Sequence, residues 1–291
     1  MMIQLNACPF NLELTLCCGQ AFRWNKHGDW WYGIAYEKVF KVRQLVDKLE
    51  FENVDEGFVK SYFGLNDNLP HILSQISKDT HIKRVIEKFY GLRIIRQNPW
   101  ECLISYICAT YKNIPAIRRM LNNISKSFGE EICFENKKFY TFPKPQRLTK
   151  ATIKELANCG LGYRAKYIHE TAKKIHEEDF EFESLRRMPY EKARKELLSF
   201  PGVGLKVADC VLLFSLEKFE AFPVDVWVKR AVLRHYPQHF SKEFLKKISD
   251  KKSLSSSEYK QISLFGRKYF GAYAGYAQEY LYHHERTNAT L

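Results

Sequence analysis

The first sixty residues of the chain alternate apolar and polar positions with a short period. Aromatic and β-branched residues form three runs, over residues 21–24, 30–35 and 39–46, with polar breaks between them. Runs of this length and composition favour strands that are half buried against a core. The pattern therefore predicts a small antiparallel sheet domain over residues 1–61.

From about residue 65 the apolar positions recur at three- and four-residue spacing, which is the period of one helix face. Pro143-Lys144-Pro145 interrupts the pattern between two of the segments. The expected fold class is therefore α+β, with a sheet domain followed by a mainly helical body. The segments that we predict to be helical are 71–92, 99–111, 115–128, 152–176, 226–235, 242–250 and 257–283.

Residues 186–215 are typical of a helix, a tight hairpin and a second helix. The hairpin is Pro201-Gly202-Val203-Gly204. It would leave backbone N–H groups free at a helix N-terminus, and the two glycines, Gly202 and Gly204, would let a phosphate approach them closely. A plain turn between packed helices is the alternative. The surrounding Phe-Pro-Gly-Val-Gly-x-Lys-x-Ala favours contact with DNA.

Lys206 lies in the first turn of the helix that follows this hairpin. The charged form of an amine is disfavoured at a helix N-terminus beside apolar surface, and a neutral amine can attack an electrophilic carbon to form a Schiff base. We therefore predict that Lys206 is a nucleophile, the alternative being a surface lysine that pairs with a phosphate. Cys210 lies one turn further on the same face, as a pocket residue or an ordinary core thiol.

Asp225 follows Pro223-Val224 and precedes the predicted helix 226–235. Its position is that of an N-cap, and this structural role is one interpretation. A carboxylate there can also stabilise positive charge on a sugar ring while a glycosidic bond breaks. The two roles are compatible, and we expect both.

The last predicted helix carries a stripe of four tyrosines that we interpret as core. The stripe comprises Tyr269, Tyr273, Tyr276 and Tyr280. Gln278 and Tyr282 fall slightly off the stripe. They are better candidates for the lining of a pocket.

Net charge and cysteine usage narrow the class of protein further. The 291 residues carry a formal net charge of +13, with a sequence pI near 9.2, which favours nucleic acid as a partner and anionic membrane second. The eight cysteines form no Cys-x-x-Cys pair, and none follows Cys210, which excludes a C-terminal four-cysteine iron–sulfur loop. We expect reduced thiols, an intracellular protein (cytoplasm or nucleoid if prokaryotic) and no signal peptide or transmembrane segment.

Seven segments in order make the chain similar to the 8-oxoguanine DNA glycosylase/AP lyases of the helix–hairpin–helix glycosylase superfamily. Gly-Gln-x-Phe-Arg-Trp and Lys-x-x-x-Cys are the most specific of their motifs. The resemblance covers nearly the whole chain. The matching segments are Cys18 to Trp24, Tyr62 to Leu65, Gln97 to Leu103, Leu161 to Ala165, Gly204 to Cys210, Pro223 to Asp225 and Gly271 to Gln278.

The resemblance implies a role for each of these candidate residues. Lys206 would attack the sugar C1′, expel the oxidised base and promote β-elimination, with support from Asp225. The backbone carbonyl of Gly19 would accept the N7 proton that distinguishes 8-oxoguanine from guanine. The remaining implied roles are a sandwich of the base by Cys210 and Tyr282, a bond from Gln278 to its Watson–Crick edge, a wedge at Tyr163 and a contact of Arg164 with the opposite strand.

Two departures from the family pattern concern DNA contacts. Tyr111 and Ala116 stand where eukaryotic members carry polar groups that read the opposite cytosine, so we hypothesise a weak preference for the base opposite the lesion. Trp227 stands where many relatives have a phosphate-contacting histidine. Tyr111 and Trp227 are nevertheless expected to lie in the DNA-binding face.

The fold that the resemblance implies is a twisted antiparallel N-terminal domain and two helical subdomains around a cleft. The expected boundaries are 1–61 for the sheet, 62–92 with 211–291 for one subdomain, and 93–210 for the subdomain that carries the hairpin. We expect a monomer that acts on duplex DNA containing 8-oxoguanine or abasic sites, with no membrane partner. No cofactor or metal ligand is expected, although a structural monovalent cation bound by hairpin carbonyls is compatible with the sequence.

Two other functions fit parts of the sequence. The first is a helix–hairpin–helix glycosylase for alkylated bases or oxidised pyrimidines, against which the Gly19 segment and the pairing of Lys206 with Cys210 argue. The second is a DNA-binding module without catalysis. Lys206 discriminates between a catalytic and a non-catalytic protein, because only an attacking amine yields a covalent adduct with DNA under borohydride.

Overall fold

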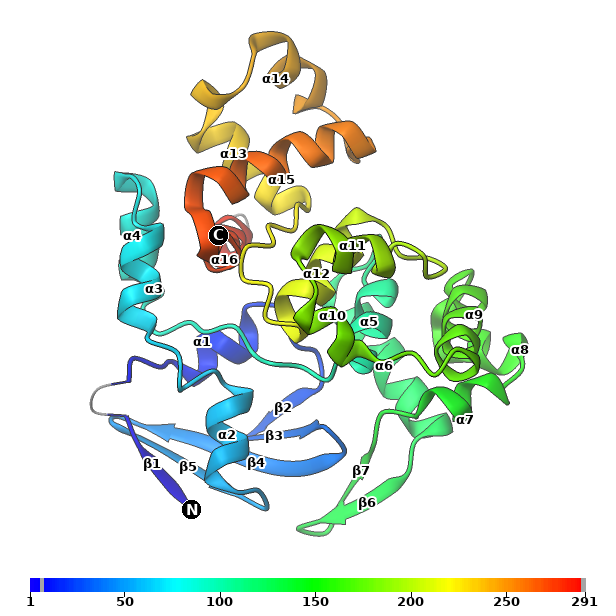
Figure 1. Ribbon diagram of the computed structural model, residues 1–291. Coiled ribbons are helices and arrows are strands. Elements are labelled where there is room, and N and C mark those ends of the chain that lie inside the picture. Colours follow the sequence, from blue (N-terminus) through cyan, green and yellow to red (C-terminus); the bar gives the residue numbers. More distant parts are fainter. Residues whose placement is uncertain (6–7, 289–291) are drawn as a thin grey trace.

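The computed structural model describes residues 1–5 and 8–288, and it places a five-stranded antiparallel sheet beneath a helical body (Figure 1). The predicted α+β fold class is confirmed. The strand order in the sheet is β1-β5-β4-β3-β2. The strands are β1 (Met2–Gln4), β2 (Trp24–His27), β3 (Trp30–Ala35), β4 (Lys38–Leu45) and β5 (Lys48–Glu52).

Helices make up most of the remainder, with one small hairpin of β6 (Glu131–Phe134) and β7 (Lys137–Tyr140) between them. None of the helices in the described part of the chain is long and apolar enough to cross a bilayer. The helices are α1 (Leu12–Cys17), α2 (Glu56–Tyr62), α3 (Leu69–Ile76), α4 (Thr80–Lys88), α5 (Pro99–Cys108), α6 (Ile114–Phe128), α7 (Pro145–Thr149), α8 (Ile153–Leu156), η1 (Ala157–Leu161), α9 (Arg164–Glu177), α10 (Phe182–Arg187), α11 (Tyr190–Leu197), α12 (Leu205–Ser215), α13 (Val226–His235), η2 (Pro237–His239), α14 (Lys242–Ser249), α15 (Ser256–Phe270), η3 (Gly271–Tyr273) and α16 (Ala274–Asn288).

The sheet is held by a buried tryptophan that needs a glycine opposite it. Trp24 pairs with Gly33, where an added Cβ would lie 2.5 Å from the indole. The same ring packs edge-on against Phe40, at 4.9 Å between centroids, and its Nε1 donates to the Tyr62 hydroxyl at 3.0 Å. Trp24 therefore joins β2, β3 and β4 to helix α2, which covers the sheet.

Three predicted helices are each interrupted, and a glycine or a cap explains each break. Asp79 caps α4, because its carboxylate accepts from the backbone N–H of His81 and Ile82, which divides the predicted helix 71–92. Gly160, at φ +86°, interrupts the predicted helix 152–176. Gly271, at φ +75°, ends α15, so the predicted helix 257–283 is α15 followed by η3 and α16.

The strand predictions were right for β3 and β4 and only partly right elsewhere. The run 21–24 contributes only Trp24 to a strand, since β2 continues into the polar residues up to His27. Strands β1 and β5 and the β6–β7 hairpin were not predicted. These strands are three to five residues long, and β5 and β7 are also rich in charged residues, so their sequences lack the long apolar run that marked β3 and β4.

Two hydrophobic clusters fill the molecule. One lies between the sheet and helices α1 and α2 and also includes Ile95. The other runs through the helical body from α3 to α16. The second cluster is continuous across residues 93–210 and 211–281. The proposed division into two helical subdomains therefore stays a prediction.

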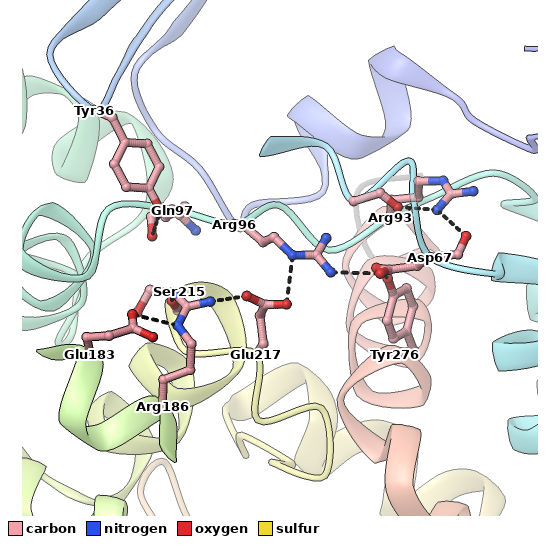
Figure 2. A network of polar contacts seen from close by, with 11 residues as sticks. Tyr36, Asp67, Arg93, Arg96, Gln97, Glu183, Arg186, Ser215, Glu217 and Tyr276 are labelled. Carbon is pink, nitrogen blue, oxygen red and sulfur yellow. Dashed lines mark hydrogen bonds and ion pairs between the residues drawn. The ribbon is translucent and has the colours of Figure 1, made fainter. Parts of the chain in front are cut away.

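The segment between α4 and α5 is joined to several helices by charged side chains. Arg96 forms ion pairs with Asp67 at 2.7 Å and Glu217 at 2.9 Å, and Glu217 also pairs with Arg186 (Figure 2). Tyr276 of α16 donates to Asp67 at 3.3 Å in the same network. The network thus fixes α16 and the segment after α12 relative to the segment between α4 and α5.

Gln20 attaches the N-terminal part of the chain to the same segment between α4 and α5. Its side-chain amide donates to the carbonyls of Thr15 and Arg93, at 3.0 and 2.7 Å, and accepts from the backbone N–H of Ile95 at 2.7 Å. The side chain is buried, so each of these bonds replaces one that water would otherwise supply. Gly19, its neighbour in sequence, is therefore attached to a rigid point of the structure.

Candidate active site

The predicted hairpin lies between α11 and α12, and its backbone geometry requires Gly202. This residue has φ +77°, and an added Cβ would lie 2.8 Å from the ring of Tyr167 in α9. The Thr171 hydroxyl, also in α9, donates to the Pro201 carbonyl at 3.2 Å. Gly204 is exposed and begins α12 without a side-chain cap. The first N–H groups of α12 are therefore left without a side-chain partner at the cap, as an anion site requires.

Lys206 is half-buried in the first turn of α12. Its Nζ lies 4.8 Å from the centroid of the Tyr106 ring in α5. The Tyr106 hydroxyl donates to the backbone carbonyl of Gln20 at 3.2 Å, and its ring stacks on Phe214 of α12. Tyr106 thus connects the amine with the segment that carries Gly19.

A buried carboxylate in the middle of α12 holds this helix in place. Asp209 accepts from the hydroxyls of Tyr190 at 2.7 Å and Tyr259 at 2.6 Å, and it pairs with Arg194 at 3.0 Å. Burial raises the pKa of Asp209 to about 6, against the opposing charge of Arg194. These bonds join α12 to α11 and α15.

Asp225 has the N-cap geometry that the sequence predicted. Its Oδ1 accepts from the backbone N–H of Trp227 and Val228, both at 2.9 Å, at the start of α13. Burial raises the pKa of this carboxyl, and the bond from Val228 and the charge of Lys206 act in the opposite direction. The cap therefore lies within electrostatic reach of the amine, so the two predicted roles are compatible in this structure.

Two of the residues predicted to hold a base are linked to this site, because Cys210 feels the charge of Lys206 and Gly19 lies beside Tyr282. Gly19 has φ +105°, and a Cβ there would lie 3.0 Å from the Tyr282 hydroxyl. Cys210 is buried, and burial raises the pKa of its thiol to about 12 against the charge of Lys206, so the thiol is neutral. Gln278 is 4% exposed, and its Oε1 has no hydrogen-bond partner among the described residues.

The predicted DNA-facing residues divide into exposed and buried ones. Tyr163 is 57% exposed and Tyr111 is 81% exposed, the latter at φ +54°. Arg164 is instead 3% exposed, and its guanidinium donates to the Thr110 carbonyl and lies 4.5 Å from the Tyr163 ring centroid. In this conformation Arg164 contacts the ring of Tyr163 and the residue that precedes Tyr111. Trp227 is half-buried, 4.8 Å from the Arg230 guanidinium.

Comparisons with known proteins agree with the geometry over the whole chain. Residues 2–103 match the model for "8-oxoguanine DNA glycosylase, N-terminal domain", and residues 104–251 match the "HhH-GPD superfamily base excision DNA repair protein" model. The chain is 37% identical to an N-glycosylase/DNA lyase of Saccharomyces cerevisiae, over 97% of this chain and 85% of that protein. The chain belongs to the 8-oxoguanine DNA glycosylase/AP lyase family.

A second relative and two solved structures are also similar to this chain. N-glycosylase/DNA lyase OGG1 of Arabidopsis thaliana is 30% identical over 96% of this chain and 78% of its own length. The 8-oxoguanine glycosylase/lyase of Clostridium acetobutylicum, solved with duplex DNA containing cytosine opposite 8-oxoG, superposes with a TM-score of 0.88 at 33% identity, covering 99% of this chain and 98% of that one. A 3-methyladenine DNA glycosylase of Archaeoglobus fulgidus, at 22% identity and a TM-score of 0.77, shares the fold.

One ionisable residue of this family member escaped the sequence analysis. Glu279 is 2% exposed on α16, and burial raises the pKa of its carboxyl to about 7. Lys206 and Asp225 both act on its charge. The signal that could have found it is a carboxylate inside the tyrosine stripe, between Tyr276 and Tyr280, where an apolar residue is the rule.

Further expectations concerned metal ligands, the state of the cysteines, a cation at the hairpin and the oligomeric state. Across residues 1–5 and 8–288 there is no group of three or more histidine, cysteine or acidic residues able to hold a metal ion. All eight cysteines lie in this part of the chain and are free thiols. The monovalent cation at the hairpin stays a prediction, as does the monomeric state.

We expect Gly202→Ala to lower the free energy of unfolding by about 2 kcal/mol or more and to weaken binding to undamaged duplex DNA. An alanine would have to adopt a left-handed backbone and would overlap the Tyr167 ring. Urea denaturation and fluorescence anisotropy measure the two effects. Gly204→Ala is the control for stability, because its φ is −94° and nothing lies within 4 Å of the added Cβ. Equal stability of the two variants would contradict this account of the hairpin.

We expect the thermal stability of Glu279→Gln relative to the natural protein to rise between pH 5 and pH 8. The folded chain holds the Glu279 proton up to a pKa of about 7, whereas a free carboxyl loses it near 4.5, so the folded state binds more protons in this interval. The contribution of Glu279 to stability therefore falls as the pH rises through the interval, and glutamine avoids that loss. Thermal denaturation at each pH measures the difference.

Glu258→Gln is the matched control for this measurement. The bond from Lys251 lowers the pKa of Glu258 to about 2, which lies below the interval, so its effect on stability is expected to be constant from pH 5 to pH 8. A constant difference for Glu279→Gln as well would show that its carboxyl titrates outside this range.

Proposed function

We propose that this protein is a bifunctional DNA N-glycosylase and AP lyase that removes 8-oxoguanine from duplex DNA. The observation that carries the proposal is the position of Lys206, in the first turn after the hairpin and within electrostatic reach of Asp225. Support comes from relatives named N-glycosylase/DNA lyase and from a structural neighbour named 8-oxoguanine glycosylase/lyase.

The first chemical step is removal of the base from a flipped nucleotide. A stacked base cannot reach this amine, so the nucleotide leaves the duplex first and the exposed Tyr163 fills the gap. The lone pair of Lys206 Nζ then attacks C1′ while the bond from C1′ to N9 breaks, and the base departs with the bonding electrons and takes up a proton. Positive charge that develops on the sugar is stabilised by the carboxylate of Asp225.

Strand cleavage follows from the amine bound at C1′. The sugar ring opens as the C1′–O4′ bond breaks and O4′ takes a proton, which leaves a Schiff base between C1′ and Lys206. Loss of a proton from C2′ then expels the 3′ phosphate by β-elimination. Water finally releases Lys206 from the product, so the enzyme needs no cofactor for either step.

Recognition of the lesion rests on a hydrogen bond that guanine cannot make. The backbone carbonyl of Gly19 accepts the N7 proton of 8-oxoguanine, while Cys210 and Tyr282 contact the two faces of the base and Gln278 contacts its Watson–Crick edge. A buried acceptor left without a donor costs about 1–3 kcal/mol, so guanine is rejected at this position. The positive φ of Gly19 and the neutral thiol of Cys210 are compatible with these roles.

Contacts with the DNA backbone and the opposite strand surround this pocket. The N-terminus of α12, with Gly202 and Gly204, binds a phosphate, and Trp227 lies beside the same strand. Tyr111 and Arg164 face the opposite strand, where Arg164 acts by holding the Thr110 carbonyl next to Tyr111. The net charge of +13 strengthens all of these contacts and makes them sensitive to salt.

We expect Lys206→Gln to abolish borohydride trapping on DNA that contains 8-oxoguanine while lesion binding is retained. The amide cannot form the imine that borohydride reduces. Trapped complex is measured on denaturing gels and binding by anisotropy, with duplexes that contain 8-oxoguanine, an alkylated purine or an abasic site. Lys195→Gln, an exposed lysine of α11, is the control for loss of one positive charge. A Lys206→Gln variant that still traps DNA would place the nucleophile elsewhere.

We expect comparable excision of 8-oxoguanine opposite C, A, G and T, because Tyr111 and Ala116 offer neither an amide nor a guanidinium group to read the opposite base. Single-turnover rates on the four duplexes measure this. The double variant Tyr111→Asn/Ala116→Arg should gain a preference for C, since one well-placed bidentate contact is worth about 1–3 kcal/mol. A strong preference for C in the natural protein would contradict the hypothesis.

A further inference from the structure

Helix α16 presents, on consecutive residues, two buried hydrogen-bond acceptors that have no donor among residues 1–5 and 8–288. These are Oε1 of Gln278, which is 4% exposed, and Oε1 of Glu279, which is 2% exposed. Buried polar atoms in native proteins are nearly always paired, and each unpaired one costs about 1–3 kcal/mol. Two such atoms on consecutive residues therefore indicate a place where a ligand supplies the donors.

Glu279 differs in this respect from the other buried carboxylates of the described residues. Asp209 is bonded to two tyrosines and Arg194, Glu258 to Lys251 at 2.6 Å and to Lys247 at 3.3 Å, and Glu285 to Arg234 and His235. Each of these three has partners that explain its burial. Only Glu279 among them keeps an oxygen without a donor.

The surroundings of Glu279 are those of the proposed base pocket. Its carboxyl lies against the Cys18 thiol, which precedes Gly19 in sequence, and it senses the charges of Lys206 and Asp225. Its own charge acts in turn on Cys210 and on Tyr282. The carboxyl thus belongs to the same cluster as the residues that contact the base, although the proposed reaction assigns it no part.

Donor groups are distributed unevenly on an 8-oxoguanine base. One edge carries N7–H, and the opposite edge carries N1–H together with the two hydrogens of the exocyclic amino group at C2. Above a pH of about 7 the side chain of Glu279 is an ionised carboxylate. A carboxylate accepts hydrogen bonds only, so it matches this second edge and mismatches an adenine, whose N1 is an acceptor. Bonds of this kind to a charged acceptor are about twice as strong as neutral ones.

We propose that Glu279 is a specificity-determining residue whose carboxylate accepts a hydrogen bond from the exocyclic amino group of the flipped base, beside Gln278. The inference rests on the proposed function, because it names a contact to the substrate of that reaction. It gives a reason why the buried Oε1 of Glu279 has no partner among the described residues. The energetic cost of that burial is recovered when the base enters.

The test compares two lesions that differ only in this amino group. Single-turnover excision rates are measured on duplexes containing 8-oxoguanine or 8-oxohypoxanthine, with the natural protein, Glu279→Gln and Glu285→Gln. We expect the natural protein to favour 8-oxoguanine by roughly tenfold or more, since it gains a bond to a charged acceptor. In Glu279→Gln the rate on 8-oxoguanine should fall by a similar factor and the rate on 8-oxohypoxanthine should stay within about twofold.

Glu285→Gln is the matched control, because it replaces another buried carboxyl of α16 whose partners, Arg234 and His235, lie outside the pocket. It should leave the ratio between the two lesions unchanged. Thermal denaturation of each variant confirms that it is folded.

Three outcomes would overturn the proposal. Equal losses on both lesions would assign Glu279 a general structural role, and unchanged rates would assign it none. A ratio between the two lesions that stays constant while discrimination against guanine falls would show that Glu279 acts through Cys18 on Gly19. Absence of borohydride trapping by the natural protein would instead overturn the proposed function itself, so the two failures are distinguishable.

Discussion

The geometry of the active site depends on the bonds made by one buried carboxylate, Asp209. Its bonds to Tyr190, Arg194 and Tyr259 hold the middle of α12 against α11 and α15. Lys206 and Cys210 lie on either side of it along the same helix. Removal of one partner from a buried ion pair typically costs about 3–5 kcal/mol, so this cluster resists local opening of α12. The amine therefore projects from a helix whose position is set by charge as well as by packing.

A second set of bonds brings the N-terminal sheet domain into the same site. Gln20 is held by the segment between α4 and α5, and its backbone carbonyl accepts from Tyr106, whose ring lies beside the Lys206 amine. The Arg96 network acts in parallel on α16 and the end of α12. Residues that are far apart in sequence, in the two matched family regions, thus meet at one place.

Features with local causes could be predicted from the sequence, and features with distant causes could not. The hairpin at 201–204 and the Asp225 cap are determined by neighbouring residues, and both have the predicted geometry. The importance of Glu279 depends on Cys18, at the other end of the chain. The inward position of Arg164 likewise depends on the Thr110 carbonyl in another loop. The helix breaks at Gly160 and Gly271 were local and could have been predicted from glycines in a left-handed conformation.

The immobility of Gln20 has a consequence for how finely a lesion can be distinguished. 8-Oxoguanine and guanine differ at N7 by a single hydrogen, so an acceptor facing that atom meets either a donor or a lone pair. A carbonyl on a pliable loop could turn aside from the lone pair and so tolerate the undamaged base. The side chain of Gln20, the residue after Gly19, makes three hydrogen bonds. A rotation of the Gly19 carbonyl away from the base would require several of these bonds to break together. Stiffness at this one peptide is what would convert a one-atom difference into a measurable preference.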